Sequence, residues 1–142
     1  MVSDFQLKLD NKNIDTVLVL DFGSQYTQLI ARRIRELEVY SEILPWDIDP
    51  NMIRNLHPKG VILSGGPESV TQQHTPRIPE VIFELDIPIL GICYGMQTLA
   101  EQLGGQVISS DKKEFGFAEV VIQEQSILLK NINESSLKVW MS

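Results

Sequence analysis

One short stretch, residues 87–97, limits most strongly what this chain can fold into. It reads IPILGICYGMQ, so an apolar run ends at Cys93, the only cysteine, with one glycine two residues before it and another two residues after it. Apolar residues continue downstream at the i, i+3, i+4, i+7 spacing of one helix face: Met96, Leu99, Ala100 and Leu103. The stretch therefore predicts a buried strand that passes into a helix through a tight turn, with Cys93 at the corner.

The corner at Cys93 has the pattern of a nucleophile elbow in which sulfur replaces the serine oxygen. Gly91 and Gly95 suit such a turn, because a sharp, strained backbone leaves no room for side chains beside the nucleophile. The N-terminus of the helix adds unpaired N–H groups and partial positive charge, which favour a thiolate. A lone cysteine is more often a small buried residue, but the glycine spacing favours a nucleophile at this position.

Three further strand patterns precede this strand, and helical patterns separate them. Beyond a polar tail of residues 1–15, strands are expected at residues 16–20, 41–44 and 60–64. The expected helices are marked by these apolar residues: Ile30, Ile34 and Leu37, facing the sheet, in the first; Met52, Ile53 and Leu56 in the second; Val81, Ile82 and Leu85 in the third. Strands that alternate with helices predict an α/β fold with a doubly wound, mostly parallel, flavodoxin-like sheet. Further strands are expected at residues 115–122 and from Val139 onward.

The charge and the cysteine count exclude several classes of function. A net charge of −7 argues against a nucleic-acid-binding surface, which must attract phosphates. A single cysteine cannot form an internal disulfide, which fits a reducing compartment, and no apolar run approaches membrane-spanning length. One cytoplasmic domain, with neither nucleic acid nor membrane as a partner, is therefore expected.

A glycine pair marks the end of the third predicted strand. Gly65 and Gly66 leave that strand at the sheet edge where Cys93 leaves the next one, and ligands of such sheets bind beyond the carboxyl ends of the strands. Paired glycines let a backbone N–H point where a side chain would otherwise stand. The N–H groups of Gly66 and Tyr94 therefore suggest an oxyanion hole beside Cys93. On its own, the glycine pair would more often be an ordinary turn.

Three motifs together resemble a known enzyme family. They are DFGSQYT at residues 21–27, SGGPES at residues 64–69 and GICYGMQ at residues 91–97. The chain is similar to the class I, or triad, glutamine amidotransferases, and most of all to the glutaminase domain of the GMP synthetases. The resemblance runs from about residue 16 to residue 142 and includes EFG at 114–116 and VWMS at 139–142.

The resemblance implies roles for several residues. Cys93 would attack the side-chain amide of glutamine, the N–H groups of Gly66 and Tyr94 would hold the oxyanion, and Gln97 would help to bind the glutamine. The ammonia would pass to a separate synthetase domain of the ATP-pyrophosphatase type, which uses ATP and Mg²⁺ to convert XMP to GMP. Residues 16–142 would be the front part of the amidotransferase domain. The chain itself would hold no cofactor and no metal, and a homodimer would form through other regions.

The chain departs from this family in its histidines. The family's triad completes the cysteine with a histidine and a glutamate downstream of the elbow, and here no histidine follows Cys93. His57 precedes the third strand, at the opposite edge of the sheet, whereas His74 follows that strand on the correct edge but in a polar loop. The triad partners are therefore expected beyond Ser142, in a longer enzyme.

Two other interpretations stay open at this point. One is a different cysteine enzyme on the same fold, either another amidotransferase or a γ-glutamyl hydrolase. The other is a non-catalytic flavodoxin-like module, in which Gly23, Ser24 and Thr27 would hold a phosphate at a helix N-terminus. The loop carries only one glycine, which weakens the second interpretation.

Overall fold

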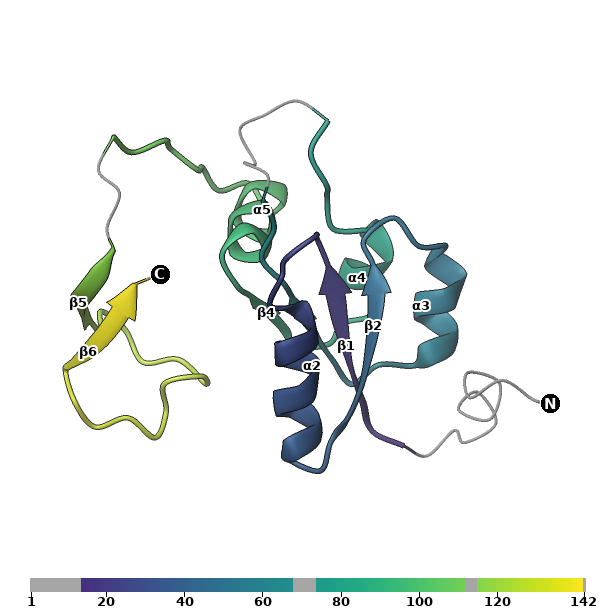
Figure 1. Ribbon diagram of the computed structural model, residues 1–142, viewed down its shortest axis with the longest axis horizontal. Helices are drawn as coiled ribbons and strands as arrows, with labels where there is room; N and C mark the ends of the chain where they lie inside the picture. Colours follow the sequence, from purple (N-terminus) through teal and green to yellow (C-terminus); the bar gives the residue numbers. More distant parts are fainter. Residues whose placement is uncertain (1–13, 68–73, 112–114, 142) are drawn as a thin grey trace. The chain divides into compact units, whose positions relative to one another are not determined.

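The computed structural model describes residues 14–67, 74–111 and 115–141. The described residues up to Ile108 and those from Ser109 onward form two compact units (Figure 1). Most of the predicted N-terminal tail lies outside the described residues, as does part of the loop that follows the third strand, residues 68–73.

The first unit is built on a parallel sheet, whose described strands have the order β2-β1-β3-β4. They are β1 (Thr16–Asp21), β2 (Tyr40–Pro45), β3 (Gly60–Leu63) and β4 (Ile89–Gly91). In Figure 1 the arrowheads of β1 and β2 point the same way, and all neighbouring strands of this sheet pair in parallel. The loops that leave the carboxyl ends of the strands therefore share one edge of the sheet.

Helices make the crossovers that parallel strands require. They are α2 (Thr27–Glu36), α3 (Pro50–Leu56) and α4 (Glu80–Glu84), and a further helix, α5 (Tyr94–Gln102), follows β4. The carboxylate of Asp49 caps α3 by accepting from the Asn51 N–H at 2.8 Å. Gly104, with φ of +88°, ends α5, and the Gly105 N–H donates to the Ala100 carbonyl. The predicted mostly parallel, flavodoxin-like α/β fold is confirmed.

One hydrophobic core joins the sheet to the helices. Its buried members include these residues from the strands and from α3 and α4: Leu18, Leu20, Leu44, Val61, Leu63, Ile53, Val81 and Ile82. Burying a side chain of this size contributes about 1.5–3 kcal/mol to folding. Three of the apolar residues that were predicted to mark the second and third helices, Ile53, Val81 and Ile82, are thus confirmed as core residues.

The prediction that Ile30, Ile34 and Leu37 face the sheet is wrong for Leu37, at the C-terminal end of α2. Leu37 follows the helix and is 77% exposed, and Ile30 and Ile34 are only half-buried. The buried residues of α2 are Thr27 and Ala31. The reason is a close approach between α2 and the sheet, because the Ala31 carbonyl accepts directly from a β2 serine hydroxyl at 2.9 Å. A small residue permits that approach, and a periodicity count of large apolar residues does not detect it.

The predicted apolar face of α5 is also wrong for most of its members. Met96 is 54% exposed and Leu103 is 68% exposed, so the helix does not bury this face within the described unit. Its buried residues are Tyr94, Gly95 and Thr98. A Cβ placed on Gly95 would lie 2.5 Å from the carbonyl oxygen of a β3 leucine, so the helix approaches the sheet at its glycine. The face of α5 that is turned toward the sheet is therefore the one that carries Gly95, its smallest residue.

The second unit contains a two-stranded antiparallel ribbon of β5 (Gly116–Val121) and β6 (Ser136–Met141). Both strands were predicted, although β6 begins three residues earlier than the sequence pattern indicates. Phe117 lies opposite Trp140 in the register, and both side chains are exposed. Across both units, the described residues contain no helix that is long and apolar enough to cross a membrane.

Candidate active site

Cys93 occupies the predicted corner between β4 and α5. Its backbone has φ of +50° and ψ of −115°, a conformation that residues with a side chain rarely adopt. The Ile92 N–H donates to the Leu63 carbonyl at 3.0 Å, and the Gly95 N–H donates to the Ser64 carbonyl at 3.1 Å. These hydrogen bonds to β3 and its exit hold the strained turn in place. The thiol is exposed and stands at the N-cap of α5.

The two glycines that flank Cys93 are required by the packing of the turn. A Cβ on Gly91 would lie 2.6 Å from the Cα of Met96, and a Cβ on Gly95 would lie 2.6 Å from the Cβ of Leu63. Either contact is far shorter than real Cβ atoms tolerate, so any side chain would push α5 away from β3 or from β4. The expectation that these glycines form a nucleophile elbow agrees with this geometry.

The loop that leaves β3 reaches the cysteine, as predicted. Ser64 fixes the start of this loop: it is fully buried, its N–H donates to the Leu20 carbonyl at 3.0 Å, and its hydroxyl accepts from the Phe22 N–H at 3.1 Å. The next residue, Gly65, lies against the nucleophile. A Cβ on Gly65 would be 3.5 Å from the Cβ of Cys93. The β3 and β4 loops therefore meet at the carboxyl edge of the sheet.

Two backbone donors at this edge have no partner among residues 14–67, 74–111 and 115–141. They are the N–H groups of Gly66 and Tyr94, the candidate oxyanion hole. Tyr94 is held firmly, because its side chain is 2% exposed and its ring lies 5.5 Å from that of Phe22. Gly66 packs against the backbone of Phe22, because a Cβ on Gly66 would be 2.7 Å from the Phe22 carbonyl oxygen. Both donors are thus fixed in place beside the elbow.

Gln97, the candidate glutamine-binding residue, lies one turn along α5 from the cysteine. Its N–H donates to the Cys93 carbonyl at 3.0 Å, and its side chain is half-buried. Within the described residues no hydrogen bond engages its side-chain amide. The predicted placement, one helical turn beyond the nucleophile, therefore agrees with the structure.

Ser24, in the loop after β1, lies near the candidate site, although sequence reasoning considered it only in a family motif and as a possible phosphate ligand. Its hydroxyl oxygen would be 3.7 Å from a Cβ on Gly65, the glycine that also lies against Cys93. The same oxygen accepts from the Tyr26 N–H at 3.0 Å. The loop reaches the site because β1 is the neighbour of β3 in the sheet. A strand order of this kind is not readable from the spacing of apolar residues.

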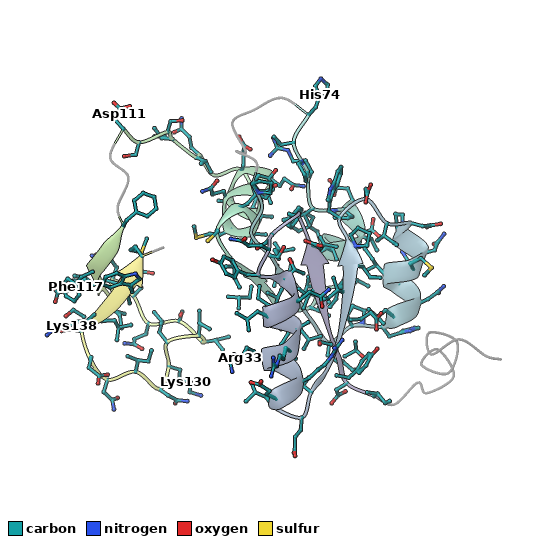
Figure 2. The ribbon with its side chains drawn as sticks, viewed as in Figure 1. Arg33, His74, Asp111, Phe117, Lys130 and Lys138 are labelled. Carbon is teal, nitrogen blue, oxygen red and sulfur yellow. The ribbon has the colours of Figure 1, made fainter. Side chains whose placement is uncertain are left out.

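Neither histidine of the chain is placed as a partner for the thiol. His57 ends α3 ahead of β3, at the opposite edge of the sheet, and its Nδ1 is 2.9 Å from the Asn55 carbonyl oxygen. His74 is exposed, and Figure 2 shows its side chain pointing outward from the loop that precedes α4. Within the described part of the chain His74 makes no hydrogen bond or ion pair. Both positions agree with the expectation from sequence.

The loop that could have held a phosphate is already occupied by its own hydrogen bonds. The carboxylate of Asp21 accepts from the Gly23 N–H at 2.8 Å and from the Thr27 hydroxyl at 2.9 Å. The Thr27 N–H donates to the Ser24 carbonyl. An anion would have to displace a carboxylate from these donors, so the structure disfavours the flavodoxin-like phosphate module.

If the site hydrolyses glutamine, as the family resemblance implies, Gly65→Ala should slow that reaction by about tenfold to a hundredfold in a protein that also supplies the triad partners, because a methyl group 3.5 Å from the Cβ of Cys93 would crowd the approach to the sulfur. The fold should survive, since every neighbour of that methyl group lies at ordinary van der Waals distance. Ammonia release and thermal unfolding measure the two effects. Gly60→Ala is the matched control, because it adds a methyl group to the other end of β3, 3.7 Å from the Pro88 carbonyl oxygen. Unchanged ammonia release by Gly65→Ala would show that a side chain at this position does not obstruct access to Cys93.

Residues 18–142 match the family model described as glutamine amidotransferase class-I. The curated relatives include proteins named GMP synthase [glutamine-hydrolyzing] from Ruthia magnifica, 55% identical over 137 residues, and from Paraburkholderia phytofirmans, 58% identical over 135 residues. They match 94% and 90% of this chain, which spans only 26% of the length of either relative.

A solved structure gives the same result for the fold. A Thermoplasma acidophilum protein, described as one of the subunits of a GMP synthase, superposes with a TM-score of 0.70 at 28% sequence identity. The match covers 90% of this chain and 64% of that protein. The nucleophile elbow, the glycine pair beside it and the family match over residues 18–142 together lead to one conclusion: this chain belongs to the class I glutamine amidotransferase family.

Proposed function

We propose that this chain carries the glutamine-hydrolysing site of a GMP synthetase, with Cys93 as the nucleophile. One observation carries the proposal most directly. Gly65 lies close to Cys93. The N–H groups of the residues that follow them, Gly66 and Tyr94, have no acceptor within the described residues. An exposed thiol at a strained turn, flanked by two free backbone donors, is the arrangement that acyl transfer requires.

The proposed reaction uses these groups in sequence. The sulfur of Cys93 adds to the carboxamide carbon of glutamine, and the negative charge on the amide oxygen is held by the N–H groups of Gly66 and Tyr94. Collapse of this intermediate breaks the C–N bond, and the nitrogen takes up a proton and leaves as ammonia. Water then attacks the γ-glutamyl thioester, releasing glutamate and returning the thiol. Gln97 binds the substrate from the first turn of α5.

Proton transfer is the part of the reaction that these residues do not supply. The leaving nitrogen must gain a proton and the attacking water must lose one, and no histidine follows Cys93 in the sequence. His57 lies at the far edge of the sheet, and His74 points outward. We therefore propose that the acid–base pair, a histidine and a glutamate in this family, comes from outside these 142 residues.

The fate of the ammonia is proposed from the named relatives. The chain spans about a quarter of the length of the curated relatives named GMP synthase [glutamine-hydrolyzing], which leaves room in those proteins for a synthetase part. The ammonia would be used there to aminate XMP to GMP with ATP and Mg²⁺. Residues 16–142 would then be the front part of the amidotransferase domain, in agreement with a family match that begins at residue 18. The homodimer and the cytoplasmic location stay predictions.

The proposed function predicts a split between two nitrogen sources. In the complete enzyme, Cys93→Ser should abolish GMP formation from glutamine and leave GMP formation from added ammonium unchanged, because only the first reaction needs the thiol. Absorbance of XMP conversion to GMP measures both rates on one preparation. Met96→Ser, an exposed change on the same helix, serves as the control. If Cys93→Ser kept its glutamine-dependent rate, or lost both rates equally, the proposed role of Cys93 would be wrong.

A further inference from the structure

A short segment, Pro76, Arg77 and Ile78, runs along α5 and is attached to it by side chains; we call it the strap. Each residue of the strap is held by a different residue of the helix. The Tyr94 hydroxyl donates to the Pro76 carbonyl, and Arg77 pairs with Glu101 at 2.6 Å. The third attachment, between Ile78 and the last residue of α5, is the most complete.

Gln102 binds both backbone groups of Ile78. Its Oε1 accepts from the Ile78 N–H at 2.8 Å, and its Nε2 donates to the Ile78 carbonyl at 3.0 Å. The fully buried Thr98 hydroxyl donates to the same Oε1 at 2.8 Å, which fixes the orientation of the amide. A side-chain amide that pairs with a backbone in both directions sets the position of that backbone along the helix.

The strap leads from Gln102 back to the candidate oxyanion hole. Two residues before Ile78, the Pro76 carbonyl accepts from the hydroxyl of Tyr94, whose own N–H is one of the two unpaired donors beside Cys93. The Tyr94 ring is buried and leans on Phe22, so the hydroxyl bond and the ring contact together fix this residue. A shift of the strap would therefore reach a group that contacts the substrate.

We infer that Gln102 is a positioning residue for glutamine hydrolysis: by holding Ile78 it sets the strap on α5, and the strap holds Tyr94 with its N–H directed at the oxyanion. This inference rests on the proposed function and adds a residue at the far end of α5 from the nucleophile. Displacing a donor by a fraction of an ångström weakens transition-state binding while leaving the thiol itself intact. Binding by the oxyanion donors and the reactivity of the thiol can be measured separately on this chain.

The test compares two reagents on the same cysteine. Iodoacetamide reports only the accessibility and reactivity of the Cys93 thiol, whereas a diazo-ketone analogue of glutamine also needs its carbonyl oxygen in the oxyanion hole. Gln102→Met should lower the rate constant for the analogue by about tenfold and leave that for iodoacetamide unchanged. Gln102→Glu keeps the acceptor and loses the donor to Ile78, so its loss should be smaller. Gln106→Met, the same substitution at an exposed position, should change neither rate.

A second variant tests the route through the strap. Tyr94→Phe removes the bond to the Pro76 carbonyl and keeps the ring on Phe22, so it should lower the analogue rate as Gln102→Met does. The double variant should lose no more than the larger single loss, because both changes interrupt one chain of contacts. Thermal unfolding of each variant is followed in parallel. Should Gln102→Met fail to fold, the Gln102→Glu variant and the Tyr94→Phe variant decide the question.

Each result has a distinct consequence. Equal rates for wild type and the Gln102 variants with the analogue would overturn this inference alone, as would an equal fall with both reagents, which indicates a structural role only. Additive losses in the double variant would overturn the route through Pro76. If the analogue did not modify even the wild-type chain while iodoacetamide did, the proposed function would fail and this inference with it.

Discussion

Incubated with glutamine, the 142-residue chain should release ammonia at no more than the background rate, although it carries the nucleophile. The elbow and the Gly66 loop supply the sulfur and the two oxyanion donors, but acyl transfer also needs groups that move protons. General acid–base catalysis contributes about 10²–10⁴ in rate at each step, and a triad loses most of its catalysis when one member is missing. No side chain in the described residues is placed to do this work at Cys93.

His74 is the one residue that could overturn this expectation. It lies on the correct edge of the sheet, but it is exposed, has no hydrogen-bond partner within the described residues to orient its ring, and points outward in Figure 2. A coupled glutamate dehydrogenase assay measures the release of ammonia by the chain and by its His74→Ala variant. We expect the two to be equal and near zero. Rapid turnover that disappears in His74→Ala would show that this chain contains its own base.

The sequence was sufficient to predict the positions of the strands, but not their burial: β4, which was expected to be buried, is half-buried at the edge of the described sheet, and its Leu90 is 39% exposed. β1 was predicted from its continuous apolar run, and the geometry of Gly91 and Gly95 agrees with the turn at Cys93 that their spacing indicated. The meeting of the β3 and β4 loops was also predicted, since both leave neighbouring parallel strands at the same edge, and the structure shows it as the close approach of Gly65 to Cys93.

The sequence failed where a helix meets the sheet through small residues. In α5 the large apolar residues Met96 and Leu103 are exposed, while Gly95 and Thr98 are buried, because backbone contact with β3 excludes any side chain at Gly95. Periodicity counts apolar bulk and gives no weight to a glycine. Ala31 in α2 shows the same effect. Contacts of this kind depend on the distance between two backbones, which apolar spacing does not specify.

The candidate site was predicted from motifs, but its supports were not. Ser24 lies near the site because β1 and β3 are neighbours in the sheet. The strap is held on α5 by side-chain hydrogen bonds such as those of Gln102 with Ile78, which join residues 24 positions apart in the chain. A polar helix residue like Gln102 is read from sequence as a solvated one. Only the fold shows that its amide has a backbone partner in both directions.

We expect a diazo-ketone analogue of glutamine to alkylate this chain at Cys93, and Cys93→Ser to abolish the modification completely. The chain has one thiol, and it is exposed at the elbow. The Gly66 and Tyr94 donors can hold the carbonyl oxygen of the reagent while the thiol proton passes to the diazo carbon, N₂ leaves and the sulfur bonds to that carbon. This step needs fewer proton transfers than full hydrolysis does, so it should proceed where turnover does not. Glutamine should slow it by competing for the same site.

Peptide mapping of the alkylated chain by mass spectrometry tests the central claim most directly, namely that Cys93 and the two free backbone donors form a glutamine site. The reagent is added with and without excess glutamine, and iodoacetamide is used in parallel as the reagent that needs no oxyanion hole. The predicted result is one adduct, on the peptide that contains Cys93, whose formation glutamine slows with either reagent, because bound glutamine covers the thiol. An analogue adduct elsewhere in the chain, or one on Cys93 that glutamine does not slow, would contradict the claim.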